Sequence, residues 1–527
     1  MRSLLMFPDR EFDPDQLLTD MAYRRPGVDR TEQLTPHDRT LIQDLELDTL
    51  LHAMAGGDEF LLPVAQQAVL SGLRNNVETI LYRQEVLRDC LKEPAVVRQL
   101  YHLTVEAIER ARKKWWSLSS DYPGSLLSDA IGLLETLLGM LRDLRALTAE
   151  QSGRFESKAF TALFAMVRNE LGDEYLATVE NHLRELKFRK GVLLSAELGD
   201  WNESAKLVLR KVPDKRQNWW ERILGKGPSG YTFRLAERDE AGARILSDMR
   251  YRGISRVAIA LAESADHVLS FFRMLKTELA FYAGCLNLHD RLAAKGEPVC
   301  FPAPALLGER KHRFIGLYDV CLSLHMEGRV VGNSVEADGK SLTIITGANQ
   351  GGKSSFLRSI GLAQLMMQCG MFVGAESFEA DLCTALFTHY RREEDATMKS
   401  GKFDEEMARM SGIVDDIKPN SLLLFNESFA ATNEREGSEI AKQIVCALLE
   451  KRVKIFYVTH LYEFARSFFD RKAGDAIFLR AERKGDGTRT FRLLEGEPLE
   501  TSYGEDLYRQ IFNSNASSQN EPSDGMR

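Results

Sequence analysis

The sequence predicts a multidomain protein in which a mainly α-helical region is followed by an α/β domain. Three observations carry this prediction. Apolar residues recur at helical spacing through the first half of the chain, short apolar runs alternate with helical segments from about residue 315, and one of those runs leads into the glycine-rich stretch "GANQGGKS". With 527 residues, the chain is long enough for about two to four domains.

Composition places the chain among ordinary globular proteins. Hydrophobic residues make up 44% and charged residues 28%, and the net charge of -8 does not support a generally basic nucleic-acid binder, although local basic patches are compatible with one. The seven cysteines are scattered and form no C-x-x-C pair, which argues against a zinc ribbon or a redox motif. No secretory segment or membrane-length apolar run is present, so we expect a cytoplasmic protein.

Changes in composition and in the spacing of apolar residues along the chain predict its segments. Residues 1–40 contain four prolines and are expected to form an N-terminal arm. Residues 41–314 follow a helical pattern, interrupted near 190–240 by a small insert whose stretches "GVLLSAEL" and "SAKLVLRKV" indicate strands. Residues 315–512 alternate between apolar runs and helical segments, and residues 513–527 are low in apolar residues and are expected to be disordered.

The stretch "GANQGGKS" fits the phosphate-loop pattern G-x-x-x-x-G-K-[ST] at every required position. It follows the apolar run "LTIIT" and precedes a helical pattern, so strand, glycine loop and helix occur in the order that a P-loop NTPase needs. Lys353 is expected to reach the β- and γ-phosphates of ATP, and the Ser354 hydroxyl to bind Mg²⁺. The predicted nucleotide-binding residues are Gly347, Ala348, Asn349, Gln350, Gly351, Gly352, Lys353, Ser354 and Ser355.

A second apolar run, "SLLLFNES", ends on Asn426 and Glu427. Glu427 is a candidate to polarise the attacking water, although a glutamate that merely ends a strand would look the same in isolation. Asn426 stands where an aspartate is common in such sites. Its amide oxygen accepts a hydrogen bond from a metal-bound water but carries no charge, so we expect Ser354 and the phosphates to hold the metal and hydrolysis to be slow.

A third run, "VKIFYVTH", ends on Thr459 and His460. A histidine at a strand end beside a nucleotide can sense the γ-phosphate, whereas a lone histidine is more often structural. With Glu427 and Lys353, His460 completes the set of residues that we expect to carry the chemistry.

Taken together, these strand ends resemble the ATPase domain of the MutS family of DNA mismatch-repair proteins, a relative of the ABC ATPases. The resemblance is carried by the segments "TGANQGGKSSFLRSIGLAQLMMQCGMFVGAE", "NESFAATNEREG", "VTHLYEF", "TSYGEDL" and "VVGNSV". The last of these implies that Asn333 helps to hold the adenine. The stretch from "DLELDTLLHAMAGG" onward is similar to the start of the family's helical core and lever region.

The sequence departs from the family pattern in several places, of which two bear on DNA recognition and on the dimer. No segment resembles the mismatch-binding and connector domains, so the resemblance does not by itself imply direct mismatch recognition. The signature segment, which completes the nucleotide site of a partner subunit, normally has Ser-Thr before Phe, whereas "SGKFDEEM" has Gly401 and Lys402 there. Ser400 and Lys402 are alternative candidates for the contact with the partner's γ-phosphate.

The resemblance implies a homodimer, or a dimer with a related chain, formed through the ATPase domains. In such a dimer, ATP drives clamping on mismatched, branched or recombining DNA during repair or recombination. An alternative is an ABC-like mechanical ATPase that acts on a protein partner without binding DNA. A basic, Trp-containing stretch offers a candidate DNA surface, although such charges are often no more than a solvated face. The candidate contacts are Arg210, Lys211, Lys215, Arg216 and Lys226.

Overall fold

The computed structural model describes residues 1–12, 34–115, 123–189, 191–198, 204–210, 234–236, 238–348, 350–392, 401–471, 474–484 and 488–498. The chain divides into two compact units. The first unit comprises residues 1–4, 95–156 and 160–279, and the second comprises residues 5–94, 157–159 and 280–527. Within the described ranges, no helix is both long enough and apolar enough to cross a lipid bilayer.

The first unit is built from long helices and one strand pair. Helix α6 shows why these helices form: its leucines and isoleucine recur at intervals of three and four residues, and the side chains that share this face are buried. Strands β1 (Leu193–Leu198) and β2 (Ser204–Arg210) pair in an antiparallel ladder. The helices are α5 (Pro94–Trp115), α6 (Pro123–Gln151), α7 (Lys158–Glu170), α8 (Asp173–Leu186) and the part of α10 (Glu240–Ala294) that ends at Leu279.

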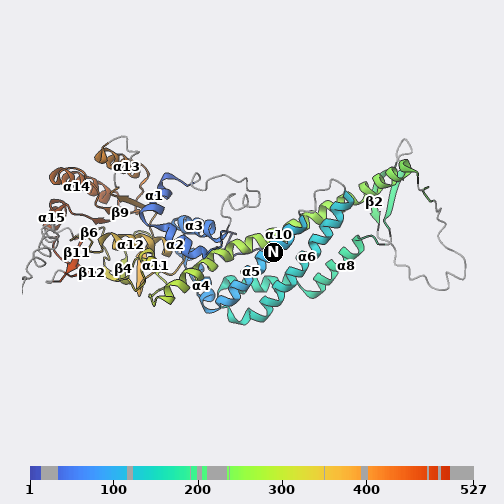
Figure 1. Cartoon of the computed structure of the whole chain (residues 1–527), viewed down its shortest axis with the longest axis horizontal. Coiled ribbons are helices and arrows are strands. Elements are labelled where there is room, and N and C mark those ends of the chain that lie inside the picture. The colour runs from blue at the N-terminus through green and yellow to red at the C-terminus, as the bar shows by residue number, and fades with distance from the viewer. Residues whose placement is uncertain are drawn as a thin grey trace, which may run out of the picture. The chain divides into compact units, whose positions relative to one another are not determined.

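The second unit begins with short helices and continues into two sheets with their own helices (Figure 1). Thr35 starts the first of these helices with a capping box, in which its hydroxyl accepts from the Asp38 amide. The helices are α1 (Pro36–Asp44), α2 (Leu47–Ala55), α3 (Leu61–Ser71), α4 (Val77–Lys92), the end of α10, α11 (Val320–His325), α12 (Lys353–Gln368), α13 (Lys402–Asp416), α14 (Glu434–Glu450) and α15 (Tyr462–Asp470).

The main sheet of this unit has six strands in the order β12-β11-β6-β10-β9-β8. All neighbours are parallel except β12, which pairs antiparallel with β11. Because the parallel strands share one direction, their carboxyl ends lie along one edge, where ligands bind in open α/β sheets. The strands are β6 (Leu342–Thr346), β8 (Leu386–Tyr390), β9 (Leu422–Asn426), β10 (Lys454–Val458), β11 (Ala476–Arg483) and β12 (Arg489–Glu495).

A second sheet of four strands has the order β3-β7-β4-β5. Its strand β4 pairs antiparallel with both neighbours, whereas β3 and β7 are parallel. The strands are β3 (Ala303–Ala305), β4 (His312–Leu317), β5 (Asn333–Glu336) and β7 (Ser377–Asp381).

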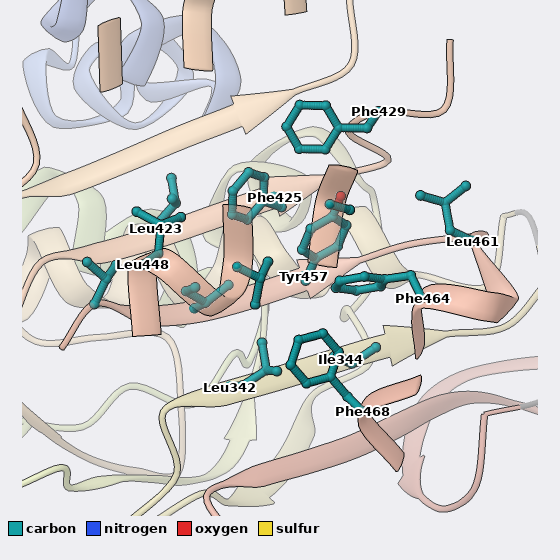
Figure 2. Close-up of a cluster of buried hydrophobic side chains, with 14 of the residues drawn as sticks. Leu342, Ile344, Leu423, Phe425, Phe429, Leu448, Tyr457, Leu461, Phe464 and Phe468 are labelled. Carbon is teal, nitrogen blue, oxygen red and sulfur yellow. The ribbon is translucent and has the colours of Figure 1, made fainter. Parts of the chain in front are cut away.

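A buried apolar cluster holds the main sheet to helices α14 and α15 (Figure 2). Strands β6, β9 and β10 are buried along nearly their whole length, as expected for central strands of a sheet with apolar contacts on both faces. Phe425 and Tyr457 stack with their ring centroids 4.7 Å apart, and Tyr457 contacts Phe464 of α15 at the same separation. This packing fixes the strand ends that carry Asn426 and His460.

The chain is mostly helical and its mixed sheets lie in the C-terminal part, as the sequence predicted. Of the expected N-terminal arm, residues 13–33 lie outside the described residues, while Leu5, Met6 and Phe7 are buried. The expected disordered tail, residues 513–527, also lies outside them.

Candidate nucleotide-binding site

The glycine-rich loop connects β6 to α12, so the predicted order of strand, loop and helix is present. Gly347 has a φ of 124° and Gly352 a φ of 87°, both in the left-handed region that side chains disfavour. A Cβ on Gly347 would also lie 2.9 Å from the Cβ of Ala481 on β11. The glycines therefore allow the loop to turn tightly above the sheet and present the first turn of α12, with its free N–H groups, to an anion.

Lys353 is buried at the first position of α12. Its Nζ donates hydrogen bonds of 2.8 Å to the main-chain oxygens of Gly347 and Ala348, so the ammonium lies within the loop. Burial lowers the pKa of Lys353 to about 8, while the nearby carboxylate of Glu427 raises it. A cation held inside the loop, within the electrostatic range of Glu427, is placed to meet phosphate oxygens.

Ser354 and Asn426 meet across the site. The Ser354 hydroxyl donates to Oδ1 of Asn426 over 3.1 Å, joining the first turn of α12 to the end of β9. Mg²⁺ can bind uncharged hydroxyl and amide oxygens directly or through water, although these oxygens contribute no negative charge to its binding. This oxygen pair fits a magnesium ion that is held mainly by phosphates.

Glu427 directly follows β9 and lies beside His460, which follows β10. Nε2 of His460 is 3.0 Å from Oε1 of Glu427, and Nη1 of Arg391 is 3.9 Å from Oε2. The hydrogen bond from His460, with the charges of His460, Lys353 and Arg391, holds the pKa of Glu427 below its usual value despite partial burial. Glu427 is therefore a carboxylate at neutral pH, and Nε2 of His460 carries the proton that it donates.

The turn after Glu427 is anchored to α13 and β8. Glu427 and Phe429 both adopt positive φ, 54° and 62°, which is unfavourable for such side chains. Oε2 of Glu406 accepts from the Phe429 amide over 3.1 Å. The ring of His389 joins the Glu406 main-chain oxygen, 3.0 Å from Nε2, to the Ser428 hydroxyl, 2.7 Å from Nδ1. These contacts hold the turn in its strained conformation.

We expect acidification to destabilise the second unit through His389. Burial lowers the pKa of His389 from 6.5 to about 4. Between these two pKa values, the histidine is protonated in the unfolded chain but stays neutral in the folded protein. The free energy of unfolding therefore falls as the pH drops from about 6.5 towards 4, by roughly 2 kcal/mol at about pH 5. Urea unfolding at about pH 7 and pH 5 should show a smaller loss in His389→Gln. The exposed His52→Gln is the matched control, and a pH dependence unchanged in His389→Gln contradicts this account.

Asn333, expected to hold the adenine, lies on β5 with its amide engaged by β12. Its Oδ1 accepts from the Leu493 amide over 2.8 Å, and its Nδ2 lies 3.3 Å from the Phe491 main-chain oxygen. Phe491 itself is 48% exposed and lies next to the loop, since a Cβ on Gly352 would be 3.5 Å from the Cβ of Phe491. An exposed aromatic ring beside the phosphate loop is a base-stacking candidate that the sequence analysis missed.

Strand β12 also places a cation at the loop. Nη1 of Arg489 donates to Oε1 of Gln350 over 2.5 Å. Gln350 has a φ of 59°, and this contact from the neighbouring strand anchors its side chain. Ser355, the last predicted loop residue, is half-buried in the first turn of α12, whereas Asn349 lies outside the described residues.

The remaining predicted residues belong to other elements of the chain or lie outside the described residues. Gly401 is exposed and caps α13, and Lys402 is the first residue of that helix, whereas Ser400 is not described. Arg210 ends β2 in the first unit, where its Nε donates to the Ser195 hydroxyl over 2.9 Å. The other candidate DNA contacts, Lys211, Lys215, Arg216 and Lys226, are not described.

Two family models match the chain. Residues 75–295 match the MutS2 N-terminal domain, and residues 343–514 match MutS domain V, which contains the loop and the three strand ends described above. The chain belongs to the MutS family. The matches place the helical region and the phosphate loop of this MutS-family chain in two separate parts of the family's architecture.

Individual relatives of this chain support the same family assignment. The DNA mismatch repair protein MutS of Syntrophomonas wolfei is 34% identical over 279 residues, covering 52% of this chain and 30% of that protein. MutS of Clostridium kluyveri is 25% identical over 305 residues, 56% of this chain and 34% of that protein. Endonuclease MutS2 of Bacillus velezensis is 31% identical over 161 residues, 30% of this chain and 20% of that protein. The matched segments thus span about a third or less of these relatives.

Proposed function

We propose that this chain binds ATP with Mg²⁺ at the phosphate loop of the second unit, hydrolyses it slowly, and uses the cycle to drive clamping on DNA in repair or recombination. The observation that carries the proposal is the meeting of Ser354 with Asn426 over 3.1 Å beside the pair of Glu427 and His460. Four residues from three distant segments converge there. Such convergence of a hydroxyl, a carboxylate and an imidazole beside a phosphate loop suits phosphoryl transfer.

The position of each side chain suits a particular role in ATP binding or hydrolysis. Lys353 binds phosphate oxygens with its buried ammonium, and the N–H groups at the start of α12 bind the same anion. Glu427 accepts the hydrogen bond of the attacking water, while His460 orients the carboxylate through the 3.0 Å contact. Mg²⁺, when bound near Ser354 and Asn426, neutralises phosphate charge. Because Asn426 is uncharged, we expect weaker metal binding and slower turnover than an aspartate would give.

The clamp proposal rests on the family and on the position of α13. Two ATPase domains would face each other, with Gly401 and Lys402, at the start of α13, contributing to the partner's nucleotide site. The positive end of a 15-residue helix suits an anion at that position. Mismatched, branched or recombining DNA is the proposed ligand, with Arg210 and its basic neighbours as candidate contacts.

DNA-stimulated ATP turnover tests the function. Phosphate release is measured with homoduplex, mismatched and junction DNA over a range of salt concentrations. We expect stimulation by at least one of these DNA structures, and a steep decline as salt rises because phosphate contacts release counterions. A protein that hydrolyses ATP but neither binds nor responds to any of them contradicts the DNA clamp and supports action on a protein partner.

A further inference from the structure

Arg391 stands at the same sheet edge as the phosphate loop. It directly follows β8, whose last residue, Tyr390, lies opposite Asn426 of β9. The Arg391 amide donates to the Asn426 main-chain oxygen over 2.9 Å, which extends the strand pairing to this residue. Its side chain is 45% exposed, and Nη1 lies 3.9 Å from Oε2 of Glu427. The guanidinium thus borders the carboxylate that we assign to the attacking water.

The Arg391 guanidinium is available to bind an anion, whereas that of the neighbouring Arg392 is engaged by other residues. At 3.9 Å, the contact with Glu427 is an ion pair without a direct hydrogen bond, and a guanidinium has five N–H donors. Arg392, the next residue, contacts Gln43 and Asp44 of α1 and is only 25% exposed. Of the two adjacent arginines, Arg391 is the one that faces the nucleotide site.

The charge of the site explains what Arg391 contributes. Triphosphate carries several negative charges, which are ordinarily neutralised in part by Mg²⁺ that an acidic strand-end residue helps to hold. Here the strand ends on the neutral Asn426, whose Oδ1 is 3.1 Å from the Ser354 hydroxyl. Lys353 and Arg391 both lie within electrostatic range of Glu427 and carry positive charge. The protein itself therefore supplies cationic groups where metal binding is weakened.

We propose that Arg391 is a phosphate-contacting residue, which binds the γ-phosphate and takes over part of the charge neutralisation that Mg²⁺ provides. This inference rests on the proposed ATP binding. Its consequence is that ATP binds with little dependence on Mg²⁺, while a carboxylate at position 426 would increase that dependence. The contact comes from the same subunit as the phosphate loop.

Equilibrium dissociation constants for ATP, with excess Mg²⁺ and with excess EDTA, test the proposal without requiring turnover. For the wild type, we expect removal of Mg²⁺ to weaken binding less than about tenfold. Arg391→Ala should weaken Mg²⁺-free binding by about tenfold or more, because a charge-assisted hydrogen bond to phosphate is lost, and Arg391→Lys should recover part of it. Asn426→Asp should show a larger ratio between the two conditions than the wild type.

Arg313→Ala is the matched control, since Arg313 is a similarly exposed guanidinium that pairs with Glu379 on the other sheet. It should bind Mg²⁺-free ATP as the wild type does. Equal Mg²⁺-free affinities of wild type, Arg391→Ala and Arg391→Lys, with binding lost in Lys353→Ala, would overturn the role of Arg391 and leave the proposed ATP site standing. A wild-type protein that binds no ATP in either condition overturns the proposed function and this inference with it.

Discussion

Replacing Glu427 by Gln is expected to lower ATP turnover by about two to three orders of magnitude while leaving ATP affinity nearly unchanged. The hydrogen bond from His460 and the neighbouring cations hold the pKa of Glu427 low, so the wild-type side chain is ionised and accepts a hydrogen bond from water. A glutamine amide still pairs with His460 through its oxygen but has no negative charge to polarise the water. Single-turnover phosphate release and titration with a fluorescent ATP analogue measure the two quantities.

Glu439→Gln provides the matched control for this substitution. Glu439 lies on the exposed face of α14 and pairs with Lys442, so the same chemical change there should leave turnover intact. Turnover unchanged in Glu427→Gln would remove Glu427 from the chemistry. Sedimentation of the same variant with ATP and Mg²⁺ also tests the proposed dimer, since trapped ATP should hold two ATPase domains together. A protein that stays monomeric at micromolar concentration contradicts that part of the proposal.

Replacing Phe425 by Ala is expected to destabilise the second unit by about 3–5 kcal/mol. Phe425 is fully buried in the cluster of Figure 2, where its ring stacks on Tyr457 with centroids 4.7 Å apart and lies 6.2 Å from Phe429. Removing the ring leaves a cavity under the strand end that positions Asn426 and Glu427. Urea unfolding gives the change in free energy, and ATP titration at low temperature reports whether the folded site survives.

Leu306→Ala controls for the loss of apolar area alone. Leu306 is 61% exposed, so its truncation should change the free energy of unfolding by less than about 0.5 kcal/mol. A Phe425→Ala protein as stable as Leu306→Ala would mean that the cluster between the sheet and helices α14 and α15 does not stabilise the unit as its packing indicates.

The phosphate loop could be predicted in detail because its information is local. The apolar run, the glycines and the following helix are contiguous, and each residue type has a direct physical reason at its position. The strand ends at Glu427 and His460 were also accessible, since short apolar runs that end on polar residues indicate parallel strands with a polar edge. The same reasoning applies to "LFTHYRR", but Arg391 was passed over there because a surface arginine carries no distinguishing pattern.

The contacts between these segments were decided by the order of the strands in space. Sequence order does not reveal that β6 lies between β10 and β11, an arrangement that brings His460 and Glu427 to the loop from segments more than seventy residues away. The antiparallel β12 places Phe491 beside Gly352 and engages the amide of Asn333, which the resemblance had assigned to adenine. Such pairings depend on hydrogen bonds and packing between segments far apart in the chain, so no single stretch of sequence predicts them.

By itself, the sequence determined the helical and α/β character of the chain, the phosphate loop and the resemblance to the MutS family, because periodicity and contiguous motifs encode them. Only the tertiary structure decided which side chains share the site: Ser354 with Asn426, His460 and Arg391 around Glu427, and His389 behind the strained turn. The physical reason is that these residues come from the ends of separate strands, and their distances are set by sheet order and core packing.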